Sequence, residues 1–80
     1  MEQADHIFES FVLEHQTMVF GCAVRMLGNR TEAQDIAQET FLRAFKHFGS
    51  LREEPAVRGW LKTVTRNLCL NHITRYRSRW

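Results

Sequence analysis

The sequence predicts an all-α fold: a bundle of three long helices with a short structured loop before the last helix. Apolar residues recur at steps of three and four along most of the chain, which is the period of a helix and not of a strand. The 80 residues include one Pro and four Gly, so few positions interrupt a long helix. A chain of this length has room for one small domain, and we expect residues 1–80 to form it.

The first predicted helix spans residues 5–27, where apolar side chains from Phe8 to Leu27 follow the helical period. Gly28-Asn29 then ends the helix, since both residue types tolerate a left-handed backbone. Gly21 lies inside this helix, where glycine costs about 1 kcal/mol relative to alanine. We expect another helix to approach closely there.

The second predicted helix begins at Thr31 as its N-cap, with Gln34 reaching back to complete a capping box. It ends at Gly49-Ser50. Its predicted buried stripe is apolar apart from one threonine and comprises Ala33, Ile36, Ala37, Thr40, Phe41, Ala44, Phe45 and Phe48.

Residues 51–54 are predicted to form a loop, and Pro55 suits the first position of the last helix, which then runs to Arg77. Its predicted buried stripe comprises Val57, Trp60, Leu61, Val64, Leu68, Cys69 and Ile73. Cys22 and Cys69 form no disulfide framework, and we expect both to be reduced core thiols.

Charge is distributed unevenly along the chain. The formal net charge is +2, but residues 1–51 sum to −3 and residues 52–80 to +5, with no acidic residue after Glu54. A basic segment of this kind is typical of a protein that binds a polyanion, although solvated basic helix tails are common. No apolar run is long enough to span a membrane, and the acidic N-terminus lacks a signal pattern, so we expect a cytoplasmic protein.

Sequence signatures of enzymes are missing: there is no Gly-rich phosphate loop, no Gly-x-Ser-x-Gly and no His-Glu-x-x-His. Cys69 and His72 are three residues apart on one helix, but two ligands do not make a zinc site. We therefore expect no catalytic residue, no metal and no cofactor.

Asp35, Gln38 and Glu39 follow each other at i, i+3 and i+4, so they share one helix face, which points away from the phenylalanine stripe. Leu42 lies on the same outward side. From spacing alone this face is either a solvated acidic surface or a docking surface.

Two motifs resemble a known family. Residues 27–45 (LGNRTEAQDIAQETFLRAF) and residues 60–75 (WLKTVTRNLCLNHITR) resemble the second conserved region of bacterial sigma factors of the extracytoplasmic-function type. The resemblance covers about residues 8–79, and the two motifs stand in the family's order. Complete factors of this type continue into a second helical domain, so residues 1–80 are either an excised domain or a natural fragment, and the end just after the basic helix favours an excised piece.

The resemblance implies that Asp35, Gln38, Glu39 and Leu42 dock on the β′ clamp helices of core RNA polymerase. It further implies that the last helix and the loop before it recognise and melt the −10 promoter element and bind its non-template single strand. The implied DNA-binding residues are Gly49, Ser50, Arg52, Arg58, Lys62, Arg66, Asn67, Asn71, Arg75 and Arg77. An anti-sigma factor that masks these surfaces is a further implied partner.

Among these implied DNA-binding residues, the charged and the amide side chains are expected to contact different parts of the DNA. Arginine and lysine neutralise phosphates without reading sequence, whereas asparagine can hydrogen-bond base edges. The loop of residues 49–55 matches the family's specificity loop, which captures a flipped base, and a plain connector is the alternative. Trp60 stacks on a melted base or belongs to the core, and its position on the apolar stripe favours the core.

Two other functions compete with this interpretation. A helical protein–protein interaction module with a solvated basic tail would share the composition but would ignore nucleic acid. A conventional helix-turn-helix protein is disfavoured, because the chain lacks a short second helix and tight turn before a recognition helix.

Overall fold

The computed structural model describes residues 2–51 and 55–76, and all of its regular structure in that part of the chain is helical. The four helices are α1 (Glu2–Leu27), α2 (Arg30–Lys46), α3 (Phe48–Leu51) and α4 (Val57–Tyr76). The predicted all-α fold with three long helices is therefore confirmed. The short helix α3 occupies a position where the sequence predicted the end of one helix and the start of a loop.

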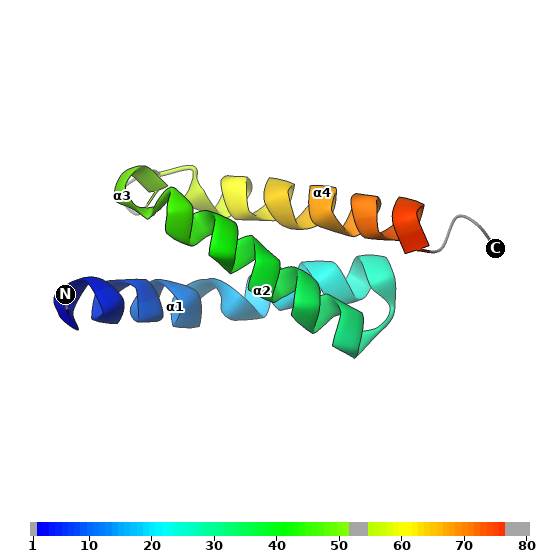
Figure 1. The fold of residues 1–80 in the computed structure, drawn as a ribbon, viewed down its shortest axis with the longest axis horizontal. Coiled ribbons are helices and arrows are strands. Elements are labelled where there is room, and N and C mark those ends of the chain that lie inside the picture. The colour runs from blue at the N-terminus through cyan, green and yellow to red at the C-terminus, as the bar shows by residue number, and fades with distance from the viewer. Residues whose placement is uncertain (1, 52–54, 77–80) are drawn as a thin grey trace.

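The long helices pack into an elongated bundle, 46 Å long and 18–21 Å across. Helices α1 and α4 run side by side in the same direction, and α2 runs back between them at an angle (Figure 1). Helix α3 caps one end of the bundle, beside the end of α2 and the start of α4 (Figure 1). Each long helix consequently contacts both of the others.

Gly28 ends α1 as predicted. Its φ is +65°, and its backbone N–H donates to the Val24 carbonyl at 2.7 Å. Glycine adopts this left-handed conformation without the steric penalty of a Cβ. The expectation for Gly21 was wrong, because an added Cβ would approach only the Arg25 side chain of the same helix, at 3.6 Å, among the described residues.

The start of α2 differs from the predicted capping box. The helix begins at Arg30, and Asn29 is its N-cap: the Asn29 Oδ1 accepts the Glu32 backbone N–H at 2.8 Å. Asparagine is among the strongest capping residues and has the extended backbone that a cap requires, so it takes precedence over Thr31 two residues later. Thr31 and Gln34 are exposed residues near the start of α2.

Between α2 and α4 the chain is more regular than predicted. Helix α2 ends at Lys46, and the His47 carbonyl then accepts the backbone N–H of Leu51 at 3.0 Å, which closes the single turn of α3. Leu51 is buried and anchors this turn to the core. Helix α4 begins at Val57, two residues after the predicted Pro55, and Pro55 itself lies in an exposed turn.

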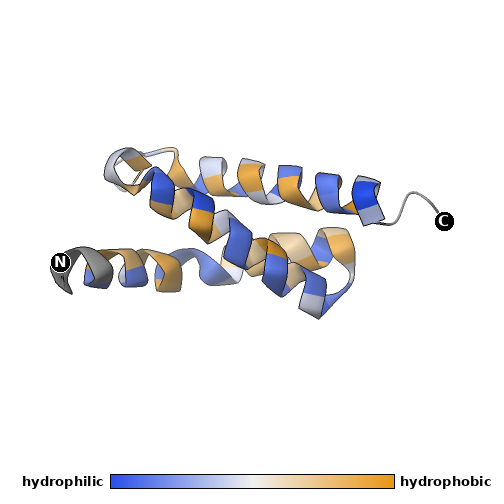
Figure 2. Cartoon of the chain, viewed as in Figure 1, coloured by the Kyte–Doolittle hydropathy of each residue, from blue (hydrophilic) through white to orange (hydrophobic). Residues whose placement is uncertain are grey.

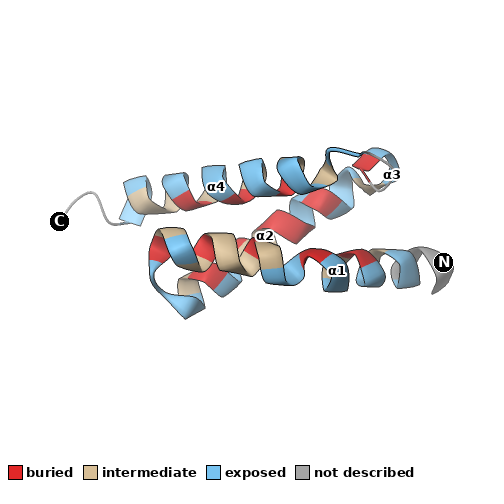
Figure 3. Cartoon of the chain, turned by 180° about the vertical axis from the view of Figure 1, so that it is seen from behind, coloured by how far each residue is buried: buried red, intermediate tan, exposed pale blue. Residues whose placement is uncertain are grey.

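The interior contains two hydrophobic clusters, and burial concentrates on the faces that the helices turn toward one another (Figure 3). Hydrophobic residues lie along the same inner faces, while polar residues cover the outer surfaces of the helices (Figure 2). The first cluster comprises Phe11, Val19, Phe41, Ala44, Leu51 and Leu61. The second comprises Ala23, Leu27, Ala33, Ile36 and Cys69.

Polar residues also enter this interior. Thr40 and Thr65 are fully buried, and each hydroxyl lies within hydrogen-bond distance of the carbonyl four residues earlier. Their Oγ1 atoms lie 3.3 Å apart, so one hydroxyl can donate to the other. His15 is buried with its ring centroid 4.7 Å from that of Phe11. Neither Thr65 nor His15 was predicted to be buried.

Cys22 and Cys69 are both free thiols. Cys69 is fully buried, and Cys22 is half-buried, with the Arg25 Nη2 at 3.5 Å from its sulfur. Burial raises the pKa of the Cys69 thiol, and the neighbouring Cys22 raises it further. The thiol of Cys69 therefore stays protonated to a higher pH than an ordinary cysteine thiol.

Candidate functional site

One candidate surface lies on the outer side of α2. Asp35, Gln38 and Leu42 are exposed, and the carboxylate of Glu39 is about half exposed. The Glu39 Oε2 lies 3.4 Å from the Nε of Arg43, one helical turn further on. The structure thus gathers the four predicted polymerase-binding residues on one surface of a rigid helix. We call these four residues the α2 face.

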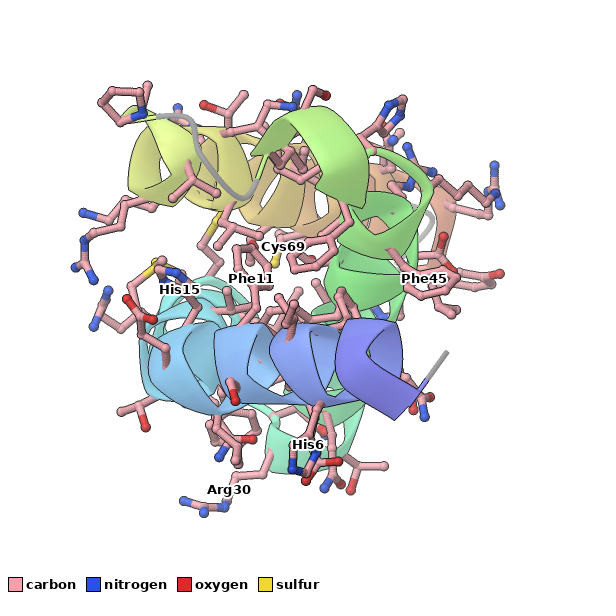
Figure 4. The ribbon with its side chains drawn as sticks, turned by 90° about the vertical axis from the view of Figure 1, so that its left-hand side faces the viewer. His6, Phe11, His15, Arg30, Phe45 and Cys69 are labelled. Atoms are coloured by element: carbon pink, nitrogen blue, oxygen red, sulfur yellow. The ribbon has the colours of Figure 1, made fainter. Side chains whose placement is uncertain are left out.

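Phe45 extends the α2 face and was assigned wrongly by the sequence pattern. The sequence predicted it to be buried, but 58% of its surface is exposed, close to the 55% of Leu42 three residues before it. In Figure 4 it points outward, whereas Phe11 points into the interior. Ala44 is fully buried, and the next residue lies about 100° further around the helix, which turns Phe45 away from the core.

The ring of Phe45 contacts that of Phe8 in α1. The two ring centroids lie 5.0 Å apart, edge to face. Phe45 and Leu42 therefore form an apolar margin beside the carboxylates of Asp35 and Glu39. Their i, i+3 spacing was the sequence signal that could have grouped them.

The predicted DNA-binding residues within α4 divide into two rows. Arg58, Lys62 and Arg66 follow at i, i+4 and i+8, and all three are exposed. Asn67, Asn71 and Arg75 form a second exposed row with the same spacing. Because Arg66 and Arg75 are nine residues apart, they lie about half a turn from each other, on opposite sides of the helix.

Two residues of the second row, Asn71 and Arg75, face α2. Asn71 and Arg75 line a pocket of about 220 Å³ together with Arg43 of α2. Next to it, Arg43 also lines a pocket of about 390 Å³ together with Lys46 of α2 and Trp60 of α4. We call these two pockets together the α2–α4 groove; its remaining lining residues are Ile36, Glu39, His47, Val64, Leu68, His72 and Tyr76.

Trp60 is half-buried and packs against the first hydrophobic cluster, in agreement with its interpretation as a core residue. Its indole also borders the α2–α4 groove, and its centroid lies 6.0 Å from the His47 ring. At the other end of the groove, Tyr76 is 59% exposed with its ring 4.9 Å from that of His72. His72 in turn lies 3.3 Å from a Glu32 carboxylate oxygen at the start of α2.

The predicted specificity loop is structured in its first part. Gly49 and Ser50 are exposed residues of α3, and the Ser50 hydroxyl donates to the His47 carbonyl at 3.1 Å. A Cβ on Gly49 would meet open space among the described atoms, so no close backbone contact within the domain requires this glycine. Arg52 and Arg77 lie outside the described residues.

The described residues hold no group of three or more His, Cys, Asp and Glu side chains that could bind a metal ion. Within the same ranges, none of the helices is sufficiently long and apolar to cross a membrane.

Comparison with known proteins connects these surfaces to a family. Residues 11–79 match the family described as Sigma-70 region 2. The chain is 36% identical over 66 residues to the RNA polymerase sigma-H factor of Pseudomonas aeruginosa, a match that covers 82% of this chain and 34% of that protein.

Two further relatives carry the more specific description. The chain is 34% identical over 68 residues to the ECF RNA polymerase sigma factor SigE of Mycolicibacterium smegmatis, covering 85% of this chain and 26% of the relative. It is 35% identical over 66 residues to the ECF RNA polymerase sigma factor SigW of Bacillus subtilis, covering 82% of this chain and 35% of the relative.

The chain spans about a third or less of the length of each of these relatives. The matched region nevertheless includes both motifs identified in the sequence, and the family is one of transcription initiation factors rather than enzymes. The chain therefore belongs to the Sigma-70 region 2 family, as the region 2 domain of an ECF RNA polymerase sigma factor.

Proposed function

We propose that this domain docks on the β′ clamp helices of core RNA polymerase and recognises and melts the −10 promoter element. The observation that carries the proposal is the separation of two chemically different surfaces on two packed helices. The α2 face presents carboxylates beside apolar side chains, whereas α4 presents exposed cations and amides. One domain can therefore hold a protein partner and a polyanion at the same time.

The α2 face has the composition of a protein-docking surface. Asp35 and Glu39 supply negative charge, which speeds and orients encounter with a basic partner. Leu42 and Phe45 supply exposed apolar area whose removal from water stabilises a complex, by about 25 cal/mol per Å² buried. Both kinds of side chain project from one rigid helix, so little order is lost on binding.

The surface of α4 has the composition of a nucleic-acid interface. Arg58, Lys62, Arg66 and Arg75 are exposed and can neutralise phosphates. Asn67 and Asn71 are exposed on the row nearer α2 and can hydrogen-bond base edges or sugars. The loop of residues 49–55, including Arg52, captures a base extruded from the melting duplex, and Arg77 extends the basic surface.

An anti-sigma factor is the third proposed partner, and it would bind the same surfaces. An anti-sigma factor that covers the α2 face or α4 would block polymerase and promoter together, in the cytoplasm where both are found. The domain itself performs no catalysis in this scheme: it supplies binding energy and orientation to the polymerase.

A binding titration tests the proposal. Single strands are first selected from a random pool with the polymerase complex, and the 80-residue chain is then titrated with the selected strand, its complement and their duplex. We expect preference for the selected strand, weak affinity and a log–log salt slope of roughly −3, which corresponds to four or five phosphate contacts on single-stranded DNA.

The same titration discriminates between the two functions. A helical interaction module with a solvated basic tail would bind none of the three DNAs above background. Equal affinity for strand and duplex, with no dependence on salt, would also contradict the proposal.

A further inference from the structure

Two thiols from different helices lie at the same end of the bundle. Cys22 belongs to the second half of α1 and Cys69 to the second half of α4, and these helices run side by side in the same direction (Figure 1). Cys69 points into the interior (Figure 4), where it packs in the second hydrophobic cluster with Ala23, the residue next to Cys22. Both thiols are free. The fold therefore brings together two cysteines that are far apart in the sequence.

The two sulfurs are close neighbours. Burial is the larger cause of the raised pKa of the Cys69 thiol, and the charge of Cys22 is the second, an effect that requires a short separation. Residues that face each other across two packed helices have Cα atoms about 4–6 Å apart, which is the separation that a disulfide spans. A bond between these sulfurs is therefore compatible with α1 and α4 as they are packed.

The surroundings of the two thiols differ. Cys22 is half-buried, and the Arg25 guanidinium donates to its sulfur at 3.5 Å. Cys69 is fully buried. Reactive cysteines lie in electropositive and partly exposed surroundings, whereas a thiol buried among apolar side chains is inert toward dissolved reagents. Cys22 is therefore the thiol that an oxidant in solution meets first.

We propose that Cys22 and Cys69 form a redox-active pair, in which hydrogen peroxide oxidises Cys22 and Cys69 then closes a disulfide between α1 and α4. Disulfides of cytosolic proteins are usually transient and respond to oxidants, so both thiols stay reduced until peroxide is present. The inference does not depend on the proposed function, and it adds to that function a modification site inside the bundle.

The reaction balances in two steps. The Cys22 sulfur attacks one oxygen of the peroxide: the S–O bond forms, the O–O bond breaks, and the departing hydroxide takes up the proton of the Cys22 thiol to give water. The Cys69 sulfur then attacks the sulfur of the Cys22 sulfenic acid: the S–S bond forms, the S–O bond breaks, and hydroxide leaves as water with the proton of Cys69. The two thiols lose two electrons in total, and one peroxide is reduced to two molecules of water.

Oxidation of the reduced 80-residue chain tests the pair. The chain is treated with hydrogen peroxide at neutral pH, denatured and labelled with iodoacetamide, and its mass and peptides are determined. We expect a monomer that has lost two hydrogen atoms, takes up no label and contains the Cys22 and Cys69 peptides joined by a bond that dithiothreitol cleaves. A disulfide between two chains, or a sulfinic acid on Cys22 beside a Cys69 that still takes up label, would overturn the proposal.

Two single variants establish the order of the steps. We expect C69S to leave a sulfenic acid on Cys22 that dimedone traps, because the second thiol is missing. We expect C22S to keep Cys69 as a free thiol over the same time, because the oxidant does not reach the buried sulfur. Trapping at Cys69 in C22S as fast as at Cys22 in C69S would overturn the proposed order.

Arg25→Gln tests the surroundings of Cys22, with Arg30→Gln as the matched control. Both arginines are exposed, but the Arg30 guanidinium lies over the Phe20 ring, at 5.5 Å from its centroid. We expect R25Q to slow the loss of free thiol severalfold and R30Q to leave the rate unchanged. Equal rates for R25Q and R30Q would contradict the contribution of Arg25.

The unfolding temperature shows whether the folded bundle accommodates the disulfide. The bond closes a long loop of the unfolded chain, so we expect the oxidised chain to unfold at least about 8 °C above the reduced chain, followed by circular dichroism. C22S treated with peroxide in the same way should show no rise. A disulfide that lowers the unfolding temperature would mean that the packed helices hold the two sulfurs apart, and the proposal would be wrong.

Discussion

The hydroxyl oxygens of Thr40 and Thr65 lie 3.3 Å apart where α2 packs on α4, and both residues are fully buried. Each hydroxyl also reaches the carbonyl one turn earlier in its own helix, at 2.9 Å for Thr40 and 2.7 Å for Thr65. This contact joins α2 to α4 by a polar interaction inside an otherwise apolar interface.

A double-mutant cycle on this pair is the first prediction. We expect Thr40→Val and Thr65→Val each to lower the free energy of unfolding by about 1 kcal/mol, and the double variant to lose about 0.5 kcal/mol less than the sum. Urea unfolding measures all four proteins, and the exposed Thr63→Val serves as the control. Additivity within about 0.3 kcal/mol would mean that the two hydroxyls do not interact.

Reversal of charge on the α2 face should weaken polymerase binding. We expect Asp35→Lys to slow association with core polymerase, most strongly at low salt, while helix content and unfolding temperature stay unchanged because Asp35 is exposed. Glu9→Lys, an exposed position of α1, makes the same change of charge elsewhere. Surface-immobilised polymerase gives both association rates; identical rates for the two variants would rule out docking through Asp35.

The apolar side chains beside the α2 face should contribute to polymerase binding independently of its charges. We expect Leu42→Ser and Phe45→Ser each to accelerate dissociation of the polymerase complex, with little loss of stability because both side chains are more than half exposed. Leu13→Ser, at a residue of α1 that is 60% exposed, is the control. Should Phe45→Ser unfold the domain while leaving the dissociation rate of the folded fraction unchanged, its role is in packing against Phe8.

The loop before α4 should set base preference. We expect a chimera with residues 49–55 from a related factor to adopt that factor's preferred base, while its overall affinity stays within the range set by the cations of α4. Competition binding among strands that differ at one base measures the preference. A chimera that keeps the original preference at full affinity would reduce the loop to a connector.

Stability should depend on pH through Cys69. Burial raises the pKa of this thiol above its ordinary 9.0, with a further contribution from Cys22, so the unfolded chain loses this proton at lower pH than the folded one. Its contribution to stability is therefore present in full below about pH 9 and is lost as the pH rises above that value.

Urea unfolding of the reduced protein from about pH 8 to about pH 10.5 measures the effect. We expect the free energy of unfolding to fall more steeply with pH for the unchanged chain than for Cys69→Ala. The two slopes, and not the absolute stabilities, are compared, because the smaller side chain also leaves a cavity. If the free energies of unfolding of the two proteins fell equally steeply with pH, the pH dependence would not arise from Cys69.

The sequence by itself determined the features that depend on neighbours along the chain. Helical spacing identified three long helices and most of their buried residues, such as Phe41 and Leu61, because a helix repeats every 3.6 residues whatever it packs against. Gly28 marked the end of α1, because a left-handed backbone favours glycine in any context. The outward position of Asp35, Gln38 and Leu42 followed from the same periodicity.

Packing between segments distant in the sequence decided which side chains are exposed and which residues of different helices come together. Phe45 is as apolar as Phe41, but Ala44 faces the other helices, and Phe45, about 100° further around α2, is 58% exposed. Asn29 and Thr31 are both good N-caps, and the geometry of the turn after α1 selects Asn29. Arg43 and Arg75 are 32 residues apart, and the crossing of α2 over α4 alone brings them to one groove. Local periodicity assigns a side chain to a face of its own helix, but burial and convergence depend on which other helix lies opposite that face.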